Sequence, residues 1–316
     1  MIPALWRLRL TLARLARSRR PILIGPYRSE VGFEVLYWLP LLHWWVQHYQ
    51  IDPARLIVVS RGGAGAWYPA ARHLELYDLV SLEECRIQAK LDHAETKLQK
   101  QTRVTVFDRS IYDAVCKTIG DRPAWLHPKV MYQGLAPWWQ ERLAVRDLSA
   151  VLRYPPIQVP PTTLPWTLPP EFIAVRFYAR ATFPITAETL SAVQTITERL
   201  TKRAPVVVLN AGVHVDDHQD FRIGGSNVWQ MPPVEARDNL ALQAAVLARA
   251  TAFVGTYGGF AQLALRLGVP SLSLYHQWHS TAPMHKVLSE LVALKTGVPF
   301  HVMRLDQAGL WRGLLT

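Results

Sequence analysis

The chain has 316 residues and is 50% apolar, so it is long and apolar enough for two hydrophobic cores and is not a disordered chain. Its 35 basic and 24 acidic residues give a net charge of +11, which favours anionic partners such as nucleotide phosphates, acidic glycans, anionic membrane surfaces or nucleic acid. The two cysteines, Cys85 and Cys116, lie in no metal or redox spacing, and no apolar run reaches the roughly 20 residues that a membrane-spanning helix requires.

Residues 1–20 predict a basic amphipathic helix. Its leucines share one face at helical spacing, namely Leu5, Leu8, Leu12 and Leu15. Its arginines lie away from that face, with Arg7, Arg14 and Arg17 opposite and Arg9 at the rim. Such a helix lies in the headgroup plane of an anionic membrane, or it packs its leucine face on the protein itself. Both interpretations stay open.

A polar loop at residues 27–32 follows a short buried strand at residues 22–24. Ligands of open α/β sheets bind at the carboxyl ends of the strands, so this loop is a candidate site. Glu30 and Glu34 are candidates for the general base that deprotonates an acceptor hydroxyl, and Arg28 is a candidate anion contact. The alternative is structural, with Glu30 capping the next helix and Glu34 complementing its dipole.

A second strand at residues 55–59 leads into a glycine-rich turn at residues 60–68. Arg61 in this turn is a candidate contact for an anionic acceptor or a donor phosphate. The turn lacks the Gly-Lys-Ser/Thr ending of a P-loop and the full dinucleotide-binding spacing, so a flexible loop is the alternative. A further strand is expected at residues 104–107, with a helix after it at residues 111–119.

Residues 154–170 contain seven prolines, which exclude a helix or a central strand and predict an extended linker. Strands and helices alternate on both sides of this stretch, which indicates α/β domains. We therefore expect a basic helix at residues 1–20, a first Rossmann-like domain at 21–153, the linker at 154–170, and a second Rossmann-like domain at 171–316.

The second half opens with a strand at residues 172–177. Arg176 and Tyr178 stand at its carboxyl end, where an arginine suits a bidentate contact with a diphosphate. A helix is expected at residues 186–202, with Thr186 as its N-cap, and a strand at residues 206–209.

A polar segment follows that strand, and Asn210, Gly212 and Asp216 are expected to contact the nucleotide or the sugar hydroxyls. His214 and His218 invite a metal interpretation, but they are not set on a helix and the nearby acids are typical turn formers. We expect no metal site here.

Residues 251–275 read as strand, glycine turn, short helix and strand. Gly258 and Gly259 let the backbone approach a bulky anion, and the helix that begins near Phe260 directs its free N–H groups to the same place. Thr256 and Tyr257 complete this candidate phosphate site. Gly268 is expected as the left-handed cap of the helix, and Pro270 prevents its continuation. The alternative is an ordinary β-α-β turn.

The run FVGTYGGFAQLALRLGVPSLSLY resembles the donor-side motif of GT-B-fold glycosyltransferases, in the neighbourhood of heptosyltransferase-like and fucosyltransferase-like enzymes. The resemblance implies an α/β fold of two Rossmann-like domains that face a central cleft. It implies a metal-independent enzyme that moves a sugar from a nucleotide-activated donor to a hydroxyl of a glycan or lipid-linked acceptor, in bacterial-type surface polysaccharide assembly. The nucleotide sugar would be a co-substrate, with no further cofactor. The protein would be cytoplasmic, with attachment to the inner face of the membrane left open.

Two other functions compete with this one. The first is an NAD(P)- or nucleotide-dependent sugar epimerase or reductase, which the missing glycine fingerprint in the first strand-to-helix turn disfavours. The second is a non-enzymatic, basic module that binds a membrane surface or a nucleic acid. Its support is the net charge, but no RNA- or DNA-binding signature is present, so we expect no nucleic-acid partner.

Overall fold

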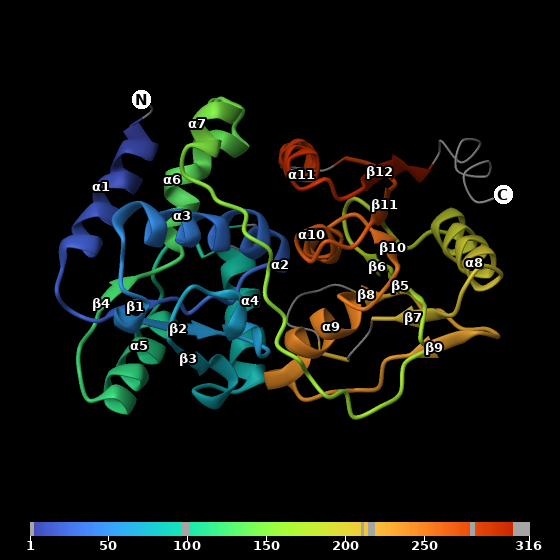
Figure 1. Cartoon of the computed structure of the whole chain (residues 1–316), viewed down its shortest axis with the longest axis horizontal. Helices are drawn as coiled ribbons and strands as arrows, with labels where there is room; N and C mark the ends of the chain where they lie inside the picture. Colours follow the sequence, from blue (N-terminus) through green and yellow to red (C-terminus); the bar gives the residue numbers. More distant parts are fainter. Residues whose placement is uncertain (1–2, 97–100, 210–211, 214–218, 279–281, 306–316) are drawn as a thin grey trace. The chain divides into compact units, whose positions relative to one another are not determined.

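The computed structural model describes residues 3–96, 101–209, 212–213, 219–278 and 282–305. The chain forms two compact α/β units (Figure 1). Unit 1 comprises Met1–Gln158 and Glu235–Ala241, and unit 2 comprises Val159–Val234 and Leu242–Thr316. The division after residue 158 falls within the proline-rich stretch, where the structure has neither helix nor strand. Two features differ from the expected segments: residues 1–20 belong to unit 1, and so do residues 235–241.

Unit 1 is built around a four-stranded parallel sheet of order β3-β2-β1-β4. Its strands are β1 (Ile22–Ile24), β2 (Leu56–Ser60), β3 (Arg72–Glu75) and β4 (Ala124–Leu126). Its α-helices are α1 (Pro3–Arg17), α2 (Val31–Phe33), α3 (Leu39–Tyr49), α4 (Leu82–Thr96), α5 (Val106–Ile119), α6 (Lys129–Trp139) and α7 (Val145–Ser149). Short turns of other helix types are η1 (Glu34–Trp38), η2 (Pro53–Arg55), η3 (Ala64–Trp67), η4 (Leu76–Asp78) and η5 (Ala236–Asp238). Every residue of β1 and β2 is buried, as expected of parallel strands covered on both faces.

Helix α1 packs its leucine face on unit 1. Leu5, Leu8 and Leu12 are each at most 3% exposed, and α1 lies against α6 and α3 (Figure 1). Gly134 of α6 makes this approach close, because a Cβ there would lie 2.7 Å from the Cβ of Leu8. The indole N–H of Trp45 also donates to the Leu12 carbonyl at 2.9 Å. The sequence alone leaves two interpretations of residues 1–20 open. For the leucine face, the structure supports the second one, in which the helix packs on the protein itself.

The strand expected at residues 104–107 is wrong, because helix α5 already begins at Val106. Thr105 caps this helix in a capping box: its hydroxyl accepts from the backbone N–H of Asp108, and Asp108 accepts from the backbone N–H of Thr105. The two reciprocal bonds satisfy donors at the helix start, and they override the strand preference of a short run rich in valine and threonine.

Unit 2 is built around a six-stranded parallel sheet of order β12-β11-β10-β5-β7-β9. These strands are β5 (Ile173–Arg176), β7 (Val206–Val208), β9 (Val228–Gln230), β10 (Ala252–Thr256), β11 (Ser271–Tyr275) and β12 (Phe300–Arg304). A two-stranded antiparallel pair consists of β6 (Tyr178–Ala179) and β8 (Gln219–Asp220). The helices are α8 (Ala187–Thr201), α9 (Asn239–Leu247), α10 (Gly259–Arg266) and α11 (Ala282–Thr296), and α9 begins on unit 1.

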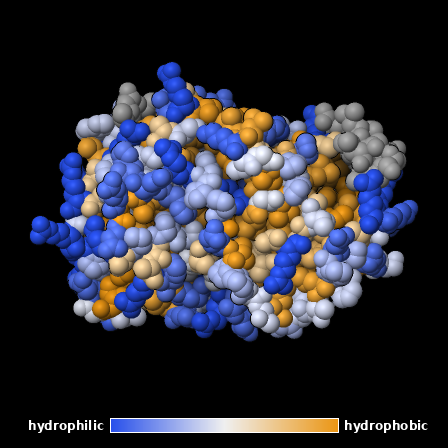
Figure 2. All heavy atoms as spheres, in the orientation of Figure 1, coloured by the Kyte–Doolittle hydropathy of each residue, from blue (hydrophilic) through white to orange (hydrophobic). Residues whose placement is uncertain are grey.

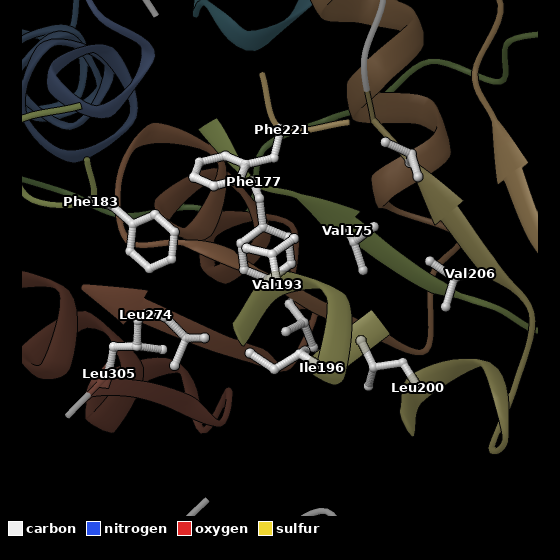
Figure 3. Close-up of a cluster of buried hydrophobic side chains, with 12 residues drawn as sticks. Val175, Phe177, Phe183, Val193, Ile196, Leu200, Val206, Phe221, Leu274 and Leu305 are labelled. Carbon is white, nitrogen blue, oxygen red and sulfur yellow. The ribbon is translucent and has the colours of Figure 1, made fainter. Parts of the chain in front are cut away.

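Helix α8 covers one face of this sheet, and α10 and α11 cover the other (Figure 1). On the α8 side, Val193, Ile196 and Leu200 pack over Val175 and Val206 of the strands (Figure 3). Thr186 caps α8 in a capping box with Thr189, so the helix predicted at residues 186–202 is confirmed to within one residue at each end. The predicted left-handed Gly268 is also confirmed, at φ +80°.

The predicted fold class is confirmed: both units are α/β, each with an all-parallel main sheet of Rossmann-like topology. The cleft between the units stays a prediction. Within the described part of the chain, no helix combines the length and the apolar character needed to cross a bilayer. Hydrophilic side chains are spread over much of the visible surface, in keeping with the net charge (Figure 2).

Candidate functional site

The chain reverses direction across the unit 2 sheet at β5. From β5 it runs outward to β7 and β9, then crosses back to β10 and continues to β11 and β12 on the other side. Adjacent parallel strands whose connections leave in opposite directions open a crevice at their carboxyl ends, where α/β proteins bind ligands. In unit 2 this position lies beyond the last residues of two adjacent strands, Arg176 of β5 and Thr256 of β10. The register places Arg176 beside Gly255.

Three polar side chains alternate along the chain as β5 runs out. Arg176, Tyr178 and Arg180 are two residues apart, which places them on one side of an extended segment. Phe177 between them points into the core on the α8 side (Figure 3). The guanidinium carbon of Arg176 lies 4.1 Å from the ring centroid of Phe260, in the first turn of α10. Alternation thus delivers two arginines and a tyrosine to the carboxyl end of the sheet.

Gly258 is the contact point between this segment and α10. A Cβ at Gly258 would lie 2.0 Å from the hydroxyl oxygen of Tyr178 and 2.8 Å from a terminal nitrogen of Arg180. The backbone of Gly258, with a φ of 168°, is in an extended conformation that any residue can adopt. Only glycine fits here nonetheless, because Tyr178 and Arg180 leave no room for a Cβ. The Arg180 guanidinium therefore lies at the N-terminal end of α10, where the helix dipole is positive.

The first N–H groups of α10 precede its hydrogen-bond ladder. The bond from the Gln262 N–H to the Gly258 carbonyl, at 3.2 Å, is the first of the i to i−4 type. The N–H groups of Gly259, Phe260 and Ala261 come before it, as in any helix start. Two guanidinium groups thus gather at the positive end of a helix, an arrangement that an anion such as a phosphate would stabilise.

Two other residues predicted to bind phosphate, Thr256 and Tyr257, make hydrogen bonds within the protein. The Thr256 hydroxyl accepts from the Tyr178 N–H and donates to the Tyr178 carbonyl, each at 3.1 Å, so it ties β10 to the extension of β5. Tyr257 is 2% exposed, and its N–H donates to the Leu274 carbonyl at 2.8 Å. Both residues shape the turn, and Gly259 is the first residue of α10.

Sequence reasoning missed the partners that orient Arg176. Its terminal Nη1 donates to the Gln243 side-chain oxygen at 2.9 Å, and its Nε lies 3.7 Å from an Asp220 carboxylate oxygen. Gln243 comes from α9 and Asp220 from β8, so only the fold brings them to Arg176. The sequence does place Arg180 at the same strand end, because it alternates with Arg176 and Tyr178.

An aromatic group that sequence reasoning did not assemble lies at the same edge of the sheet. The rings of Tyr275 and Trp278 stack with centroids 3.7 Å apart, and Tyr257 meets Trp278 edge-on at 5.9 Å. Trp278 remains 38% exposed, so it presents an aromatic surface beside the carboxyl ends of β10 and β11.

The remaining predicted residues of unit 2 lie partly outside the described chain. Asn210 and Asp216 are outside the described residues, as are His214 and His218. Gly212 is exposed, in the left-handed region at φ +69°, with open space where a Cβ would be. Across the described ranges, no group of three or more His, Cys, Asp or Glu could hold a metal ion.

In unit 1, the predicted residues Glu34 and Arg61 pair with each other. Glu34 is 0% exposed, and its Oε2 accepts from Arg61 at 2.9 Å, while its Oε1 accepts from the Tyr68 hydroxyl. Glu34 opens the π-helical segment η1, and Arg61 follows β2. Burial raises the pKa of Glu34, and Arg61 opposes that rise. These two charges satisfy one another in the interior.

Arg28 is also held by the chain itself, at the carboxyl ends of β1 and β4. It donates through Nε to Asp108 at 3.0 Å and through Nη1 to Asp92, and all three side chains are at least 93% buried. The ring of His127 accepts at Nδ1 from the Lys129 N–H at 3.0 Å, so its proton lies on Nε2, which faces Asp108 at 3.3 Å. Burial raises the pKa of Asp108, but His127 and Arg28 lower it further, so it ends well below its usual value.

Glu30 is the predicted carboxylate that stays partly exposed. It is the N-cap residue of α2, yet its side chain makes no capping hydrogen bond. Its backbone carbonyl accepts from the Tyr27 hydroxyl at 2.9 Å, which fixes the loop. Of the two candidate bases, Glu30 is therefore the one accessible to solvent.

The glycine turn after β2 already holds an anion. The N–H groups of Gly62 and Gly63 each donate to the Glu75 carboxylate at 2.9 Å, and both glycines have positive φ. Successive N–H groups in such a turn form an anion nest. Here Glu75 fills it.

Several solved structures are similar in fold to this chain. No protein-family model matches the chain, and no curated protein matches it. A glycosyltransferase of family 9 from Veillonella parvula is 11% identical, with a TM-score of 0.47 and coverage of 94% of this chain and 89% of that one. Heptosyltransferase II of E. coli is 14% identical, with a TM-score of 0.45 and coverage of 82% and 86%.

The iron-containing dodecameric glycosyltransferase TibC of enterotoxigenic E. coli is 11% identical, with a TM-score of 0.46 and coverage of 81% of this chain. The present chain spans 58% of the TibC chain. These similar structures belong to the heptosyltransferase-like neighbourhood that residues 251–275 resemble. At these TM-scores they assign no residue a role.

Proposed function

We propose that this chain is a glycosyltransferase that takes its sugar from a nucleotide-activated donor. One observation carries the proposal: Arg176 and Arg180 converge on the N-terminal end of α10, at the point where the strand order of unit 2 reverses. Guanidinium groups and helix N–H groups are the donors that bind phosphate, and this is the position where α/β sheets bind nucleotides.

The same groups suit the chemistry of sugar transfer. When the bond between the sugar and the donor phosphate breaks, negative charge grows on the departing phosphate oxygen. Preorganised cations and helix dipoles stabilise such charge in the transition state. Arg176 is preorganised by its bond to Gln243 and its contact with Phe260. Metal independence is part of the proposal, with the two arginines and α10 supplying the positive charge.

On the acceptor side, we assign the general base to Glu30. A base must exchange a proton with the acceptor hydroxyl, and Glu30 is partly exposed whereas Glu34 is enclosed by Arg61 and Tyr68. The acceptor would be a hydroxyl of a glycan or a lipid-linked sugar, in surface polysaccharide assembly on the cytoplasmic side. Trp278 offers its exposed ring to the donor base.

The test is a thermal-shift panel of UDP, GDP, CMP, ADP and dTDP, with NAD(P) in parallel. A nucleotide at ~100 times its dissociation constant should stabilise the protein by about 2.7 kcal/mol. An Arg176→Ala/Arg180→Ala variant should lose this shift. Arg203→Ala is the matched control, because Arg203 is exposed and precedes β7 at the amino end of the sheet.

The outcomes separate the alternatives. If one nucleotide family shifts the wild type and the control but not the double variant, the donor site is supported and the donor class is known. A shift with NAD(P) alone would replace the proposal by an epimerase or reductase. Equal shifts in the double variant would place the nucleotide elsewhere.

A further inference from the structure

Helix α1 has a second face, which points away from unit 1. With the leucines of the first face packed on α6 and α3, the opposite side of the helix carries Trp6, Arg7, Leu10, Arg14 and Arg17, within about 100° of arc at 100° per residue. Trp6 is 53% exposed, and the three arginines are exposed. We call these five residues the outer face of α1.

The surroundings of the outer face are basic. Helices α1, α3 and α6 contain no aspartate or glutamate, although they hold Arg7, Arg9, Arg14, Arg17 and Lys129. At the carboxyl end of α1, the hydrogen bonds of arginines run to backbone carbonyls: Arg55 donates to Ala16 at 3.3 Å and to Ser18, and Arg20 donates to the Arg122 carbonyl. The nearby Asp52 and Asp121 accept from backbone N–H groups of Ala54 and Arg122.

This combination of residues selects the kind of partner. Arginines alone would suit any polyanion, including a nucleic acid. The outer face adds an exposed indole and a leucine between the arginines. Tryptophan prefers the headgroup level of a bilayer, where its ring is half in the apolar region and its N–H is hydrated. Arginines beside it would contact anionic headgroups.

We propose that the outer face of α1 docks unit 1 onto an anionic phospholipid surface. The helix stays packed on α6 while it does so, since its leucine face is already buried. The attraction is chiefly electrostatic, at about 1 kcal/mol for each basic residue near the surface, with Trp6 as the apolar anchor. This inference is independent of the proposed sugar transfer.

The experiment measures binding of the full chain to vesicles that contain phosphatidylglycerol and to vesicles of phosphatidylcholine alone. We expect binding to the anionic vesicles only, and weaker binding at high salt. An Arg7→Gln/Arg14→Gln/Arg17→Gln variant should bind about a hundredfold more weakly, because each charge contributes roughly fivefold. Trp6→Ala should weaken binding several-fold.

The matched control removes the same number of positive charges elsewhere. An Arg109→Gln/Arg203→Gln/Lys295→Gln variant changes three exposed cations on other elements and should keep most of the binding. Equal losses in the two triple variants would show that net charge alone acts and would overturn the proposal. Binding to duplex nucleic acid but not to vesicles would overturn it in favour of a nucleic-acid partner.

A disulfide tests whether α1 stays docked. A Cβ at residue 134 would lie 2.7 Å from the Cβ of residue 8, about 1 Å closer than in a disulfide, so Leu8→Cys/Gly134→Cys can link α1 to α6 once the two helices move apart by about that distance. The proposal requires that the oxidised and reduced forms of this variant bind anionic vesicles alike. Binding by the reduced form alone would mean that α1 leaves α6 and inserts its leucine face, which contradicts the docked outer face.

Discussion

Because Gly258 has no side chain, Tyr178 and Arg180 can pack against the start of α10 in the candidate donor site. The Tyr178 hydroxyl and the Arg180 guanidinium occupy the space that a Cβ would take. Gly258→Ala should push both groups away from the start of α10, and overpacking of this kind costs about 1–3 kcal/mol of stability. We expect the variant to stay folded and to lose the nucleotide-induced thermal shift.

Gly224 provides the control for Gly258→Ala. No atom lies within 4 Å of the Cβ that an alanine would add there, and its φ is not in the left-handed region. Gly224→Ala should therefore keep both the stability and the nucleotide response. A Gly258→Ala variant that binds nucleotide as the wild type does would refute the role of this contact.

The buried pair of Glu34 and Arg61 makes a second prediction at the residue scale. Arg61→Met leaves the Glu34 carboxylate buried without its cation, a change that costs about 3–5 kcal/mol in comparable pairs. Glu34→Leu/Arg61→Met removes both charges and should cost clearly less than the sum of the single variants. Urea unfolding measures all three. Additive costs would mean that the two side chains do not stabilise one another.

His127 predicts a dependence of stability on pH. Burial lowers the pKa of His127, and the opposing effect of Asp108 is smaller. Below the unfolded-state pKa of about 6.5, the unfolded chain therefore binds a proton that the folded chain does not, and the free energy of unfolding falls as the pH falls. The stability difference between wild type and His127→Gln should be smaller at pH 5 than at pH 8. A constant difference between the two pH values would contradict the depressed pKa.

At the scale of elements, the contact between α1 and α6 depends on Gly134. Its missing Cβ would lie 2.7 Å from the Cβ of Leu8, an atom that moves only if the helix moves. Gly134→Ala should destabilise unit 1 by about 1–3 kcal/mol, although alanine is the better helix former. Leu8→Ala alone should cost about 2–5 kcal/mol.

The double variant tests whether the two positions act through one contact. In Leu8→Ala/Gly134→Ala the added methyl group meets a smaller side chain, so the combined cost should fall below the sum of the single costs. Urea unfolding followed by tryptophan fluorescence gives the three values. A cost equal to the sum would show that Gly134 does not fix the distance between the helices.

Elements whose signals are local could be predicted from the sequence. The capping residue Thr186 marked the start of α8, and Gly268 marked the end of α10. The start of α5 was missed although its signal is of the same kind, since Thr105 and Asp108 form a capping box inside a run that has strand propensity. Local hydrogen bonds decided that case, and residue propensity did not.

The candidate site was predictable only in part, because some of its contacts join residues that are far apart in the sequence. Arg176 could be placed at a strand end from its own segment, because alternation and strand length are local. Its partners Gln243 and Asp220 lie 67 and 44 residues away in the chain, and only the sheet order brings them together. Likewise, Arg28 and Arg61 looked like free anion contacts until the fold supplied Asp108 and Glu34 as their partners.

At the scale of the whole molecule, unit 1 is built from two separate pieces of chain. Residues 235–241 lie in sequence between β9 and β10, both strands of the unit 2 sheet, but they belong to unit 1. They lie on the glycine turn after β2: the Ala241 N–H donates to the Gly62 carbonyl at 2.8 Å, and a Cβ at Gly62 would meet Leu240 at 3.0 Å. The glycines therefore make room for a segment from the other half of the chain.

This arrangement predicts that residues 1–158 alone form a weakened unit 1. Leu240 is 6% exposed in the intact chain, and its removal uncovers apolar surface worth about 1.5–3 kcal/mol. A fragment of residues 1–158 should unfold at lower urea than the same fragment joined by a flexible linker to residues 235–247. Leu240→Asp in the linked fragment should cancel the gain, whereas Arg237→Ala should change little, because the ion pair of Arg237 with Asp78 is largely exposed. Equal stability of the two fragments would mean that the segment rests on unit 1 without stabilising it.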